Sequence, residues 1–233
     1  MQRSKNDSGP LRALPPDARR RTVKRVPIRS GQRGAESGCP VNMSSSYTVG
    51  YIIGSLSTES INRTLSKALI RLAPENLTLV EIPIRDLPVY NRDFDADYPP
   101  AGRALKDAIA SVDAVLFVTP EYNRGIPGSL KNAIDWASRP YGTNSLTRKP
   151  SAVIGASPGK IGTALAQQNV RSALSFCNSP QMGAPEAYIQ FTPGLITDDG
   201  EVTDKTTEQF LRDFIEAFDV FITRVLTVLP REG

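Results

Sequence analysis

The chain has 233 residues, 39% of them hydrophobic, which is enough for one α/β domain with a sizeable core. The formal net charge of +4 is uneven, because residues 1–43 hold ten Lys or Arg and three acidic residues, whereas the rest holds 18 basic and 21 acidic residues. The absence of histidine excludes Ser-His-Asp and Cys-His catalysis and the commonest zinc ligands. Two cysteines, Cys39 and Cys177, make no disulfide framework, and we expect a buried, reduced thiol at Cys177.

Residues 1–43 are predicted to be a disordered extension. They contain five prolines, several Arg and Lys clusters and few apolar residues, so they bury too little surface to offset the entropy of ordering. Nucleic-acid binding by this segment is a minor alternative, because no aromatic residue is interleaved with the basic ones. Met43 could be the translation start. The globular domain is expected to span residues 44–233, and no apolar run is long enough to predict a membrane helix.

Short apolar runs alternate with amphipathic segments along the rest of the chain. Strands are expected at residues 47–54, 76–83, 113–119, 150–157 and within 180–191. Helices are expected at residues 60–72, 101–112, 127–138, 161–177 and 205–229. This alternation predicts an α/β fold with a five-stranded parallel sheet and helices on both faces. The length favours the flavodoxin-like strand order 2-1-3-4-5, in which a ligand lies at the carboxyl ends of strands one and three.

Two further features, a long loop and a tryptophan, have expected roles of their own. The polar loop at residues 85–100 is long for a compact domain, and such loops are often lids or interface arms. Trp136, in the expected helix at residues 127–138, is predicted to be a core or interface residue rather than a catalytic one.

The loop after the first strand, GSLSTESIN, is rich in small hydroxyl residues and leads into a helix. Backbone N–H groups and the partial positive charge of a helix start make it a plausible anion seat. No Lys or Arg occurs in it before Arg63, and neutral donors suit a held phosphate better than a transferred one. The alternative is an ordinary Ser or Thr helix cap, and the loop alone does not distinguish the two.

The loops after the third and fourth strands are also distinctive. In PEYNRG, an exposed Tyr122 could lie against a planar ring, and Glu121 is expected to fix the loop by a hydrogen bond rather than to act as an acid or base. The segment 155–162 resembles a P-loop only superficially, because its glycine spacing is too short and Ile161 follows Lys160, which excludes NTP hydrolysis. Ser157 and Gly159 remain candidates for the edge of a flavin ring.

These segments together, GSLSTESIN, VTPEYNRGIPGSLKNAIDW and residues 149–159, are similar to the NADPH-dependent FMN reductase family, and among its members to bacterial chromate and quinone reductases. The similarity extends over about residues 47–229. It implies non-covalently bound FMN, hydride transfer from NADPH or NADH, and a ping-pong cycle that reduces quinones, azo or nitro compounds, chromate or free flavin. It also implies a cytoplasmic homodimer or homotetramer. The resemblance assigns FMN contacts to Ser55, Ser57, Ser60, Ile61 and Asn62 for the phosphate, and to Pro120, Glu121, Tyr122, Asn123, Ser157 and Gly159 for the isoalloxazine.

Two positions depart from the family pattern. Ser57 stands where Arg is usual, and losing an Arg–phosphate hydrogen bond of roughly 1.5–3 kcal/mol predicts FMN binding weaker by about tenfold or more, unless Arg63 or a neighbouring subunit compensates. Arg124 replaces an aromatic residue and leaves the preferred acceptor open. The alternative function is a flavodoxin-like electron carrier, which would bind FMN without oxidising NAD(P)H.

Overall fold

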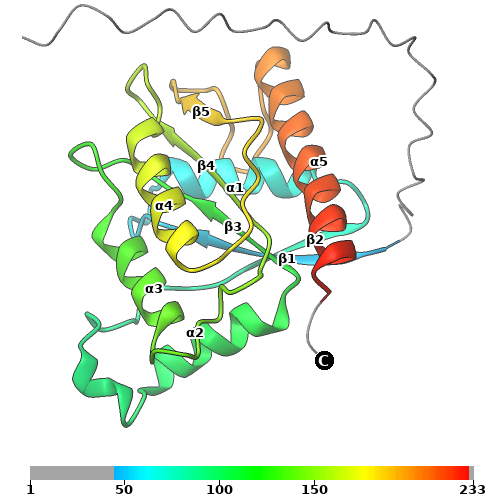
Figure 1. Ribbon diagram of the computed structural model, residues 1–233. Helices are drawn as coiled ribbons and strands as arrows, with labels where there is room; N and C mark the ends of the chain where they lie inside the picture. The colour runs from blue at the N-terminus through cyan, green and yellow to red at the C-terminus, as the bar shows by residue number, and fades with distance from the viewer. Residues whose placement is uncertain (1–44, 231–233) are drawn as a thin grey trace, which may run out of the picture. The chain divides into compact units, whose positions relative to one another are not determined.

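The computed structural model of the protein describes residues 45–230, which form a five-stranded parallel sheet between helices (Figure 1). The strands are β1 (Tyr47–Ile53), β2 (Leu77–Glu81), β3 (Ala114–Val118), β4 (Ser151–Ser157) and β5 (Ala187–Gln190). Their order is β2-β1-β3-β4-β5, and every neighbouring pair is parallel. The predicted fold class and strand order are confirmed, whereas the predicted disorder of residues 1–43 lies outside the described residues.

The helices are α1 (Ile61–Leu72), α2 (Pro100–Ser111), α3 (Gly128–Ser138), α4 (Ala164–Phe176) and α5 (Lys205–Val228), with a short 3-10 helix at Arg92–Asp95. Three predicted helix starts were placed too early. Ser60 precedes α1 as its cap. Pro127 precedes α3 as its cap instead of opening it. The helix expected from Ile161 begins only at Ala164, because Gly162 adopts a left-handed φ of 58° that a continuing helix does not allow.

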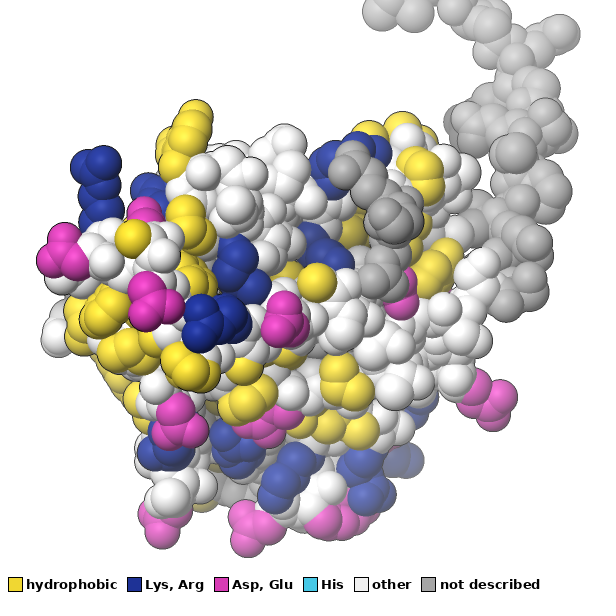
Figure 2. Space-filling model, turned by 90° about the horizontal axis from the view of Figure 1, so that it is seen from below, with side chains coloured by type: hydrophobic (Ala, Val, Ile, Leu, Met, Phe, Trp, Pro, Cys, Tyr) yellow, Lys and Arg dark blue, Asp and Glu magenta, His cyan; other side chains and the backbone are white. Residues whose placement is uncertain are grey.

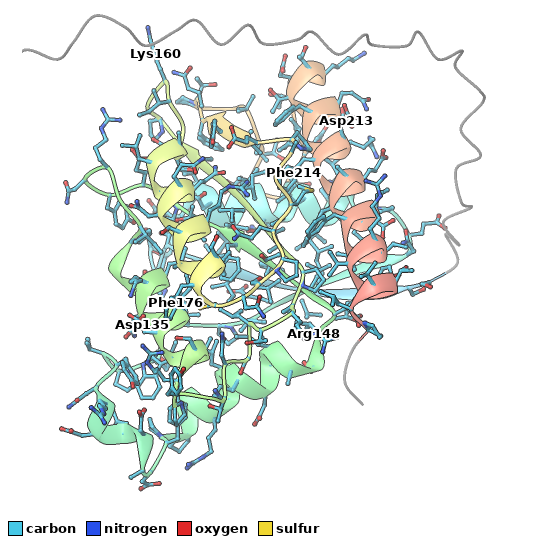
Figure 3. All side chains as sticks on the ribbon, viewed as in Figure 1. Asp135, Arg148, Lys160, Phe176, Asp213 and Phe214 are labelled. Carbon is cyan, nitrogen blue, oxygen red and sulfur yellow. The ribbon has the colours of Figure 1, made fainter. Side chains whose placement is uncertain are left out.

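The core lies in two layers, one on each face of the sheet. α1 and α5 cover one face, and α2, α3 and α4 cover the other (Figure 1). All five residues of β3 are buried, and they contribute alternately to the two layers, with Leu116 facing α1 and α5 and Phe117 facing the other three helices. On α5, Phe214 points toward the sheet and Asp213 points away from it (Figure 3). Phe218 is buried in the same layer, and Phe210 and Phe221 pack against it, so the phenylalanines of α5 serve packing.

The described surface carries charges of both signs. On the face seen in Figure 2, acidic and basic side chains are interspersed with hydrophobic ones, as expected from the near balance of charges outside residues 1–43. Within residues 45–230, every helix is too short or too polar to cross a bilayer. Cys177 is a free, buried thiol as predicted, and burial raises its pKa.

The long loop between β2 and α2 is fastened to α3 through Trp136. The indole is fully buried, and its Nε1 donates a hydrogen bond of 2.7 Å to the Pro88 carbonyl. Asn132, also on α3, donates to the same carbonyl at 2.9 Å. Three aromatic rings of the loop surround the indole at centroid distances of 5.2, 5.7 and 4.9 Å, namely Tyr90, Phe94 and Tyr98. Trp136 is a core residue, as predicted, and the loop is anchored at several points.

Trp136→Phe should lower the free energy of unfolding by about 1–3 kcal/mol, because it removes a buried hydrogen bond and leaves unfilled volume. Chemical denaturation measures this change, and limited proteolysis should cut residues 85–99 faster in the variant. Val228→Ala, at an exposed position, should change stability by less than about 0.5 kcal/mol. Equal stability and equal proteolysis of Trp136→Phe and the native chain would contradict the anchoring role.

Candidate functional site

Three loops meet at the edge of the sheet formed by the carboxyl ends of β1, β3 and β4. The Gly54 N–H donates to the Val118 carbonyl at 2.8 Å, and the Thr119 N–H donates to the Ile154 carbonyl at 2.9 Å, so sheet pairing continues into the loops. A Cβ at Gly155 would lie 2.0 Å from the Thr119 carbonyl oxygen, so glycine is required for this close approach. The loops after the first and third strands lie together as the predicted strand order requires, and the loop after the fourth strand lies beside them.

The start of α1 lacks the partners that a helix start usually has. Ser60 occupies the N-cap position with an extended backbone, yet its side chain makes no capping hydrogen bond. The Ser60 hydroxyl oxygen is buried, and within the described part of the chain no group hydrogen-bonds to it. The first turn of α1 contains no acidic residue. An unpaired buried hydroxyl and unpaired helical N–H groups are costly in isolation, and both are satisfied by a bound anion.

The start of α4, at the same edge of the sheet, is closed by a side chain. Glu121 accepts hydrogen bonds from the backbone N–H groups of Leu165 at 2.9 Å and Ala166 at 3.1 Å. Its side chain is only 7% exposed, and its other oxygen lies 3.6 Å from the guanidinium of Arg124. The predicted loop-fixing hydrogen bond of Glu121 is confirmed. Because its carboxylate already accepts from the N–H groups at the start of α4, a second anion is favoured at the start of α1 instead.

Asn62 ties α1 to β4. Its side-chain nitrogen donates to the Ala156 carbonyl, its side-chain oxygen accepts from the Ala156 N–H, and both distances are 2.9 Å. The residue is 1% exposed. The side chain of Asn62 is therefore engaged within the protein, and its backbone N–H, beside that of Ile61, is the group that remains at the start of the helix.

The loop after β3 contains a tight turn. Tyr122 and Gly125 exchange two backbone hydrogen bonds of 3.2 and 3.0 Å, and both residues between them are left-handed, with φ of 52° at Asn123 and 63° at Arg124. This is the pattern of a type I′ turn, which asparagine tolerates better than arginine does. Pro120 is buried before the turn, whereas Tyr122 is 53% exposed. The turn thus holds an exposed aromatic ring at the edge of the sheet.

The loop after β4 forms a second turn. The Ser157 hydroxyl oxygen accepts a hydrogen bond of 3.0 Å from the Gly159 N–H. Ser157 is half-buried and Gly159 is exposed. Lys160, at the tip of the loop, extends away from the fold (Figure 3). The lysine that suggested a P-loop therefore does not point into the site.

Two arginines, Arg63 and Arg85, lie near the first loop. Ser57 is exposed, and its N–H reaches the Ser55 hydroxyl at 3.4 Å. Arg63 forms a two-point ion pair with Glu81, at 2.8 and 3.0 Å, and the hydrogen bond to Glu81 raises the pKa of Arg63. Arg63, one of the two possible replacements for the arginine missing at position 57, is therefore already paired with a carboxylate. Another arginine, Arg85, reaches the loop instead and donates a hydrogen bond to the Leu56 carbonyl.

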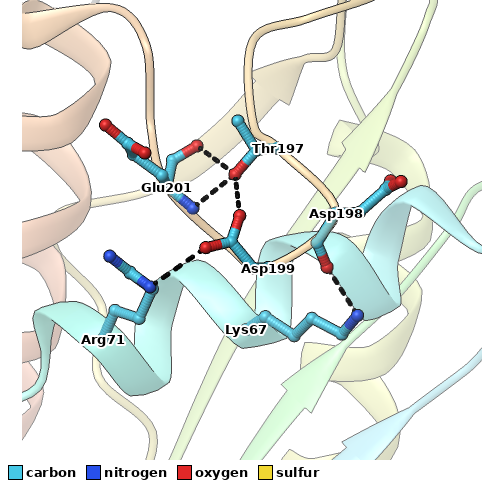
Figure 4. Close-up of polar contacts among 6 residues, drawn as sticks. All are labelled: Lys67, Arg71, Thr197, Asp198, Asp199 and Glu201. Atoms are coloured by element: carbon cyan, nitrogen blue, oxygen red, sulfur yellow. Dashed lines mark hydrogen bonds and ion pairs between the residues drawn. The ribbon is translucent and has the colours of Figure 1, made fainter.

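A cavity of about 550 Å³ lies beside the first two turns of α1, with Ser60 and Ile61 in its lining. Its opposite wall belongs to the segment between β5 and α5, which is fastened to α1 (Figure 4). Lys67 donates to the Asp198 carbonyl at 2.6 Å, and Arg71 lies 3.4 Å from Asp199. A hydrogen bond from the Thr197 hydroxyl lowers the pKa of Asp199. The wall therefore depends on polar contacts with the exposed side of α1.

Comparison with known proteins assigns the fold and these loops to a family. Residues 47–194 match the family described as NADPH-dependent FMN reductase. This chain belongs to that family. It is therefore related to oxidoreductases, and the resemblance inferred from the loop sequences is confirmed.

Individual relatives within the family cover most of the chain. A quinone reductase of Pseudomonas putida is 48% identical over 177 residues, which span 76% of this chain and 95% of the relative. A 2-hydroxy-1,4-benzoquinone reductase of a Burkholderia species is 40% identical over 174 residues, 75% of this chain and 95% of the relative. Among solved structures, FerB, a flavoenzyme NAD(P)H:(acceptor) oxidoreductase from Paracoccus denitrificans, is 49% identical. The match has a TM-score of 0.74 and covers 76% of this chain and 98% of FerB.

Glu121→Gln tests whether the carboxylate fixes the loop or transfers protons. The amide keeps one acceptor for the α4 N–H groups, so kcat for NAD(P)H-dependent reduction should stay within about threefold of the native value at each pH between 6 and 9, whereas loss of a general acid or base costs on the order of 100-fold or more. Steady-state kinetics over that pH range make the measurement. A fall of that larger size, with an altered pH profile and an unchanged thermal midpoint, would assign proton transfer to Glu121.

Proposed function

We propose that this chain binds FMN and uses it to pass electrons from NADPH or NADH to quinones, and to related acceptors such as azo compounds, nitro compounds, chromate or free flavin. The observation that carries the proposal is the open start of α1, where the buried Ser60 hydroxyl has no partner among the described residues. It lies in a chain of a family defined by FMN and NADPH. Relatives named quinone reductases support quinones as the acceptor class.

The phosphate of FMN fits the start of α1. The donors there are the hydroxyls of Ser55 and Ser60, the backbone N–H groups of Ile61 and Asn62, and at the rim Ser57. The unpaired Ser60 oxygen supports this assignment, because a phosphate oxygen would supply the hydrogen bond that the protein does not. The closed start of α4 supports it further, since the carboxylate of Glu121 would repel a second anion there.

The ring system of FMN is assigned to the two turns. Tyr122 and Asn123, held after the buried Pro120, would contact one edge, and Ser157 and Gly159 would contact the other. The exposed Tyr122 ring supports this arrangement, because an aromatic pair adds about 0.5–1.5 kcal/mol beyond the buried area. Glu121 contributes by fixing the loop through α4 and not by touching the ligand.

Bound FMN supplies the hydride acceptor and electron store, which fits a chain that has no histidine to act as an acid or base. The residues of the chain then bind, orient and shield. The short turns at residues 122–125 and 157–159 hold their backbone groups in place before the ligand arrives, which lowers the cost of orienting it. Donor and acceptor are expected to use the site in turn, which predicts ping-pong kinetics.

The alternative, an electron carrier, predicts FMN binding without NAD(P)H oxidation, and the reductase names of the relatives do not favour it.

A homodimer or homotetramer in the cytoplasm completes the proposal. Three large hydrophobic side chains are strongly exposed in the single chain and could be covered in an oligomer, namely Val89, Tyr141 and Phe176 at 84%, 90% and 78%.

Ser60→Ala separates ligand binding from folding. Without the hydroxyl, FMN should bind about tenfold more weakly or worse, because a hydrogen bond to a charged group is lost. The FMN-free protein should be as stable as the native chain or slightly more stable, because an unpaired buried oxygen has been removed. Flavin fluorescence titration and thermal unfolding of the FMN-free protein give the two quantities.

Ser66→Ala is the matched control on the same helix. Ser66 is also buried, but its hydroxyl donates to the Asn62 carbonyl at 2.8 Å, so its loss should lower stability slightly and leave FMN affinity unchanged. Equal FMN affinity in Ser60→Ala and the native chain would remove Ser60 from the phosphate site.

The activity itself is tested on the purified full chain. Yellow FMN absorbance and rapid NADPH or NADH oxidation in the presence of a benzoquinone are expected, with parallel lines in double-reciprocal plots as the mark of a ping-pong cycle. Protein that binds FMN but leaves NAD(P)H unoxidised would establish the electron carrier instead. Colourless protein that stays inactive after FMN is added would contradict both functions.

A further inference from the structure

We infer that Arg85, from the loop after β2, supplies the positive charge that balances the phosphate of FMN at the β1–α1 loop. The inference rests on the proposed phosphate site at α1 and extends it to a residue of a different segment. It names a specificity determinant for a phosphorylated flavin over an unphosphorylated one.

The sheet brings the two segments together. β1 and β2 are parallel neighbours with Tyr51 opposite Glu81, so the residues that follow both strands leave the sheet at the same edge. There the guanidinium of Arg85 donates a hydrogen bond to the Leu56 carbonyl. A cavity of about 190 Å³ lies between the segments, and Ser55 and Leu56 line it together with the charged residues Arg63, Glu81, Arg85 and Asp86. The cation therefore borders the same loop that holds the proposed phosphate donors.

The other charges near the loop are paired with a carboxylate, bonded to a different segment, or negative. Residues 55–60 contain Glu59 and no Lys or Arg. Arg63 is neutralised by its two-point pair with Glu81. Lys67, one turn further along α1, donates to the Asp198 carbonyl at 2.6 Å and lines the larger cavity beside Ser60, in contact with the segment before α5 and not with the loop after β1. Among residues 45–230, Arg85 is thus the cation that hydrogen-bonds to the loop itself, through the Leu56 carbonyl, and is not paired with a carboxylate.

The contacts of Arg85 leave it able to bind an anion. Within the described residues no ion pair joins Arg85 to a carboxylate, and its one hydrogen bond goes to an uncharged carbonyl. A guanidinium has five N–H donors in a planar fork, so most of its capacity remains for phosphate oxygens. Because Arg85 is exposed, its contribution should weaken as salt screens the charge.

The charge of Arg85 should increase the affinity for FMN but not the affinity for riboflavin, which has the same ring system and no phosphate. Protein freed of FMN is titrated with each flavin, and quenching of flavin fluorescence gives the two dissociation constants. Arg85→Ala should raise the dissociation constant for FMN about tenfold and change that for riboflavin by less than about twofold. The FMN effect should shrink between 50 mM and 500 mM salt.

Three further variants make the test specific. Arg85→Lys, which keeps the charge, should recover part of the lost FMN affinity. Ser57→Arg in the Arg85→Ala background should recover FMN affinity as well, because it returns a cation to the same loop. Arg103→Ala, which removes an exposed arginine of α2 whose nearest acidic contact is 3.9 Å away, should bind both flavins like the native chain.

Two results would overturn the inference: an equal loss of affinity for both flavins in Arg85→Ala, or no loss for either. The first would make Arg85 a structural residue of the loop. Thermal unfolding of the FMN-free variants checks that each is folded. The outcome is separate from that of the proposed function, because a phosphate-dependent difference between flavins stands even in a protein that oxidises no NAD(P)H. A native chain that binds neither flavin would overturn the phosphate site and the role of Arg85 together.

Discussion

The paired hydrogen bonds between the Asn62 amide and the backbone of Ala156 set the geometry of the site. They fix the start of α1 against the end of β4 across 94 residues of sequence, inside the protein. Breaking them would leave buried donors and acceptors unpaired, at a cost of about 1–3 kcal/mol for each. With α1 held there, its free N–H groups face the edge of the sheet where the loops after β3 and β4 converge. Because the amide is used for this attachment, Ser60 and the backbone are left to meet a ligand.

The starts of α1 and α4 at this edge differ in whether a side chain caps them. α4 receives the carboxylate of Glu121, which satisfies two of its N–H groups and holds the loop after β3. α1 receives neither a side-chain cap nor an acidic residue in its first turn. The protein thus supplies its own anion to one helix and leaves the other for an anion from outside. With this difference, one edge of the sheet would order a loop and still accept the proposed phosphate.

Much of the fold could be predicted from the sequence because its signals are local. The alternation of five apolar runs with five amphipathic segments was sufficient for a parallel sheet with helices on both faces, and the chain length favoured the strand order that the structure has. The site was predicted at the level of loops and less well at the level of contacts. The use of Asn62 and the approach of Arg85 to Leu56 depend on partners 94 and 29 residues away, and local periodicity carries no information on such pairs. The early helix start at Ile161 was wrong because the left-handed Gly162 interrupts an apolar pattern that otherwise continues.

The charged residues near the first loop also interact with partners that are distant in the sequence. Glu81 at the end of β2 neutralises Arg63 on α1, and Arg85 follows four residues later on the same segment. The loop after β1 has no cation of its own before Arg63, and it is contacted by a cation from the segment that follows β2. The parallel pairing of β1 and β2 makes this exchange possible, since it aligns the ends of both strands.

The most direct test of this account is a crystal structure of the full chain grown with FMN. The account predicts electron density for the phosphate at the start of α1, within hydrogen-bonding distance of the Ser60 hydroxyl and the N–H groups of Ile61 and Asn62, with the Asn62–Ala156 pair and the Glu121 cap of α4 unchanged. A phosphate bound at α4 in place of Glu121, or FMN bound away from the start of α1 with the Ser60 hydroxyl still unpaired, would contradict it.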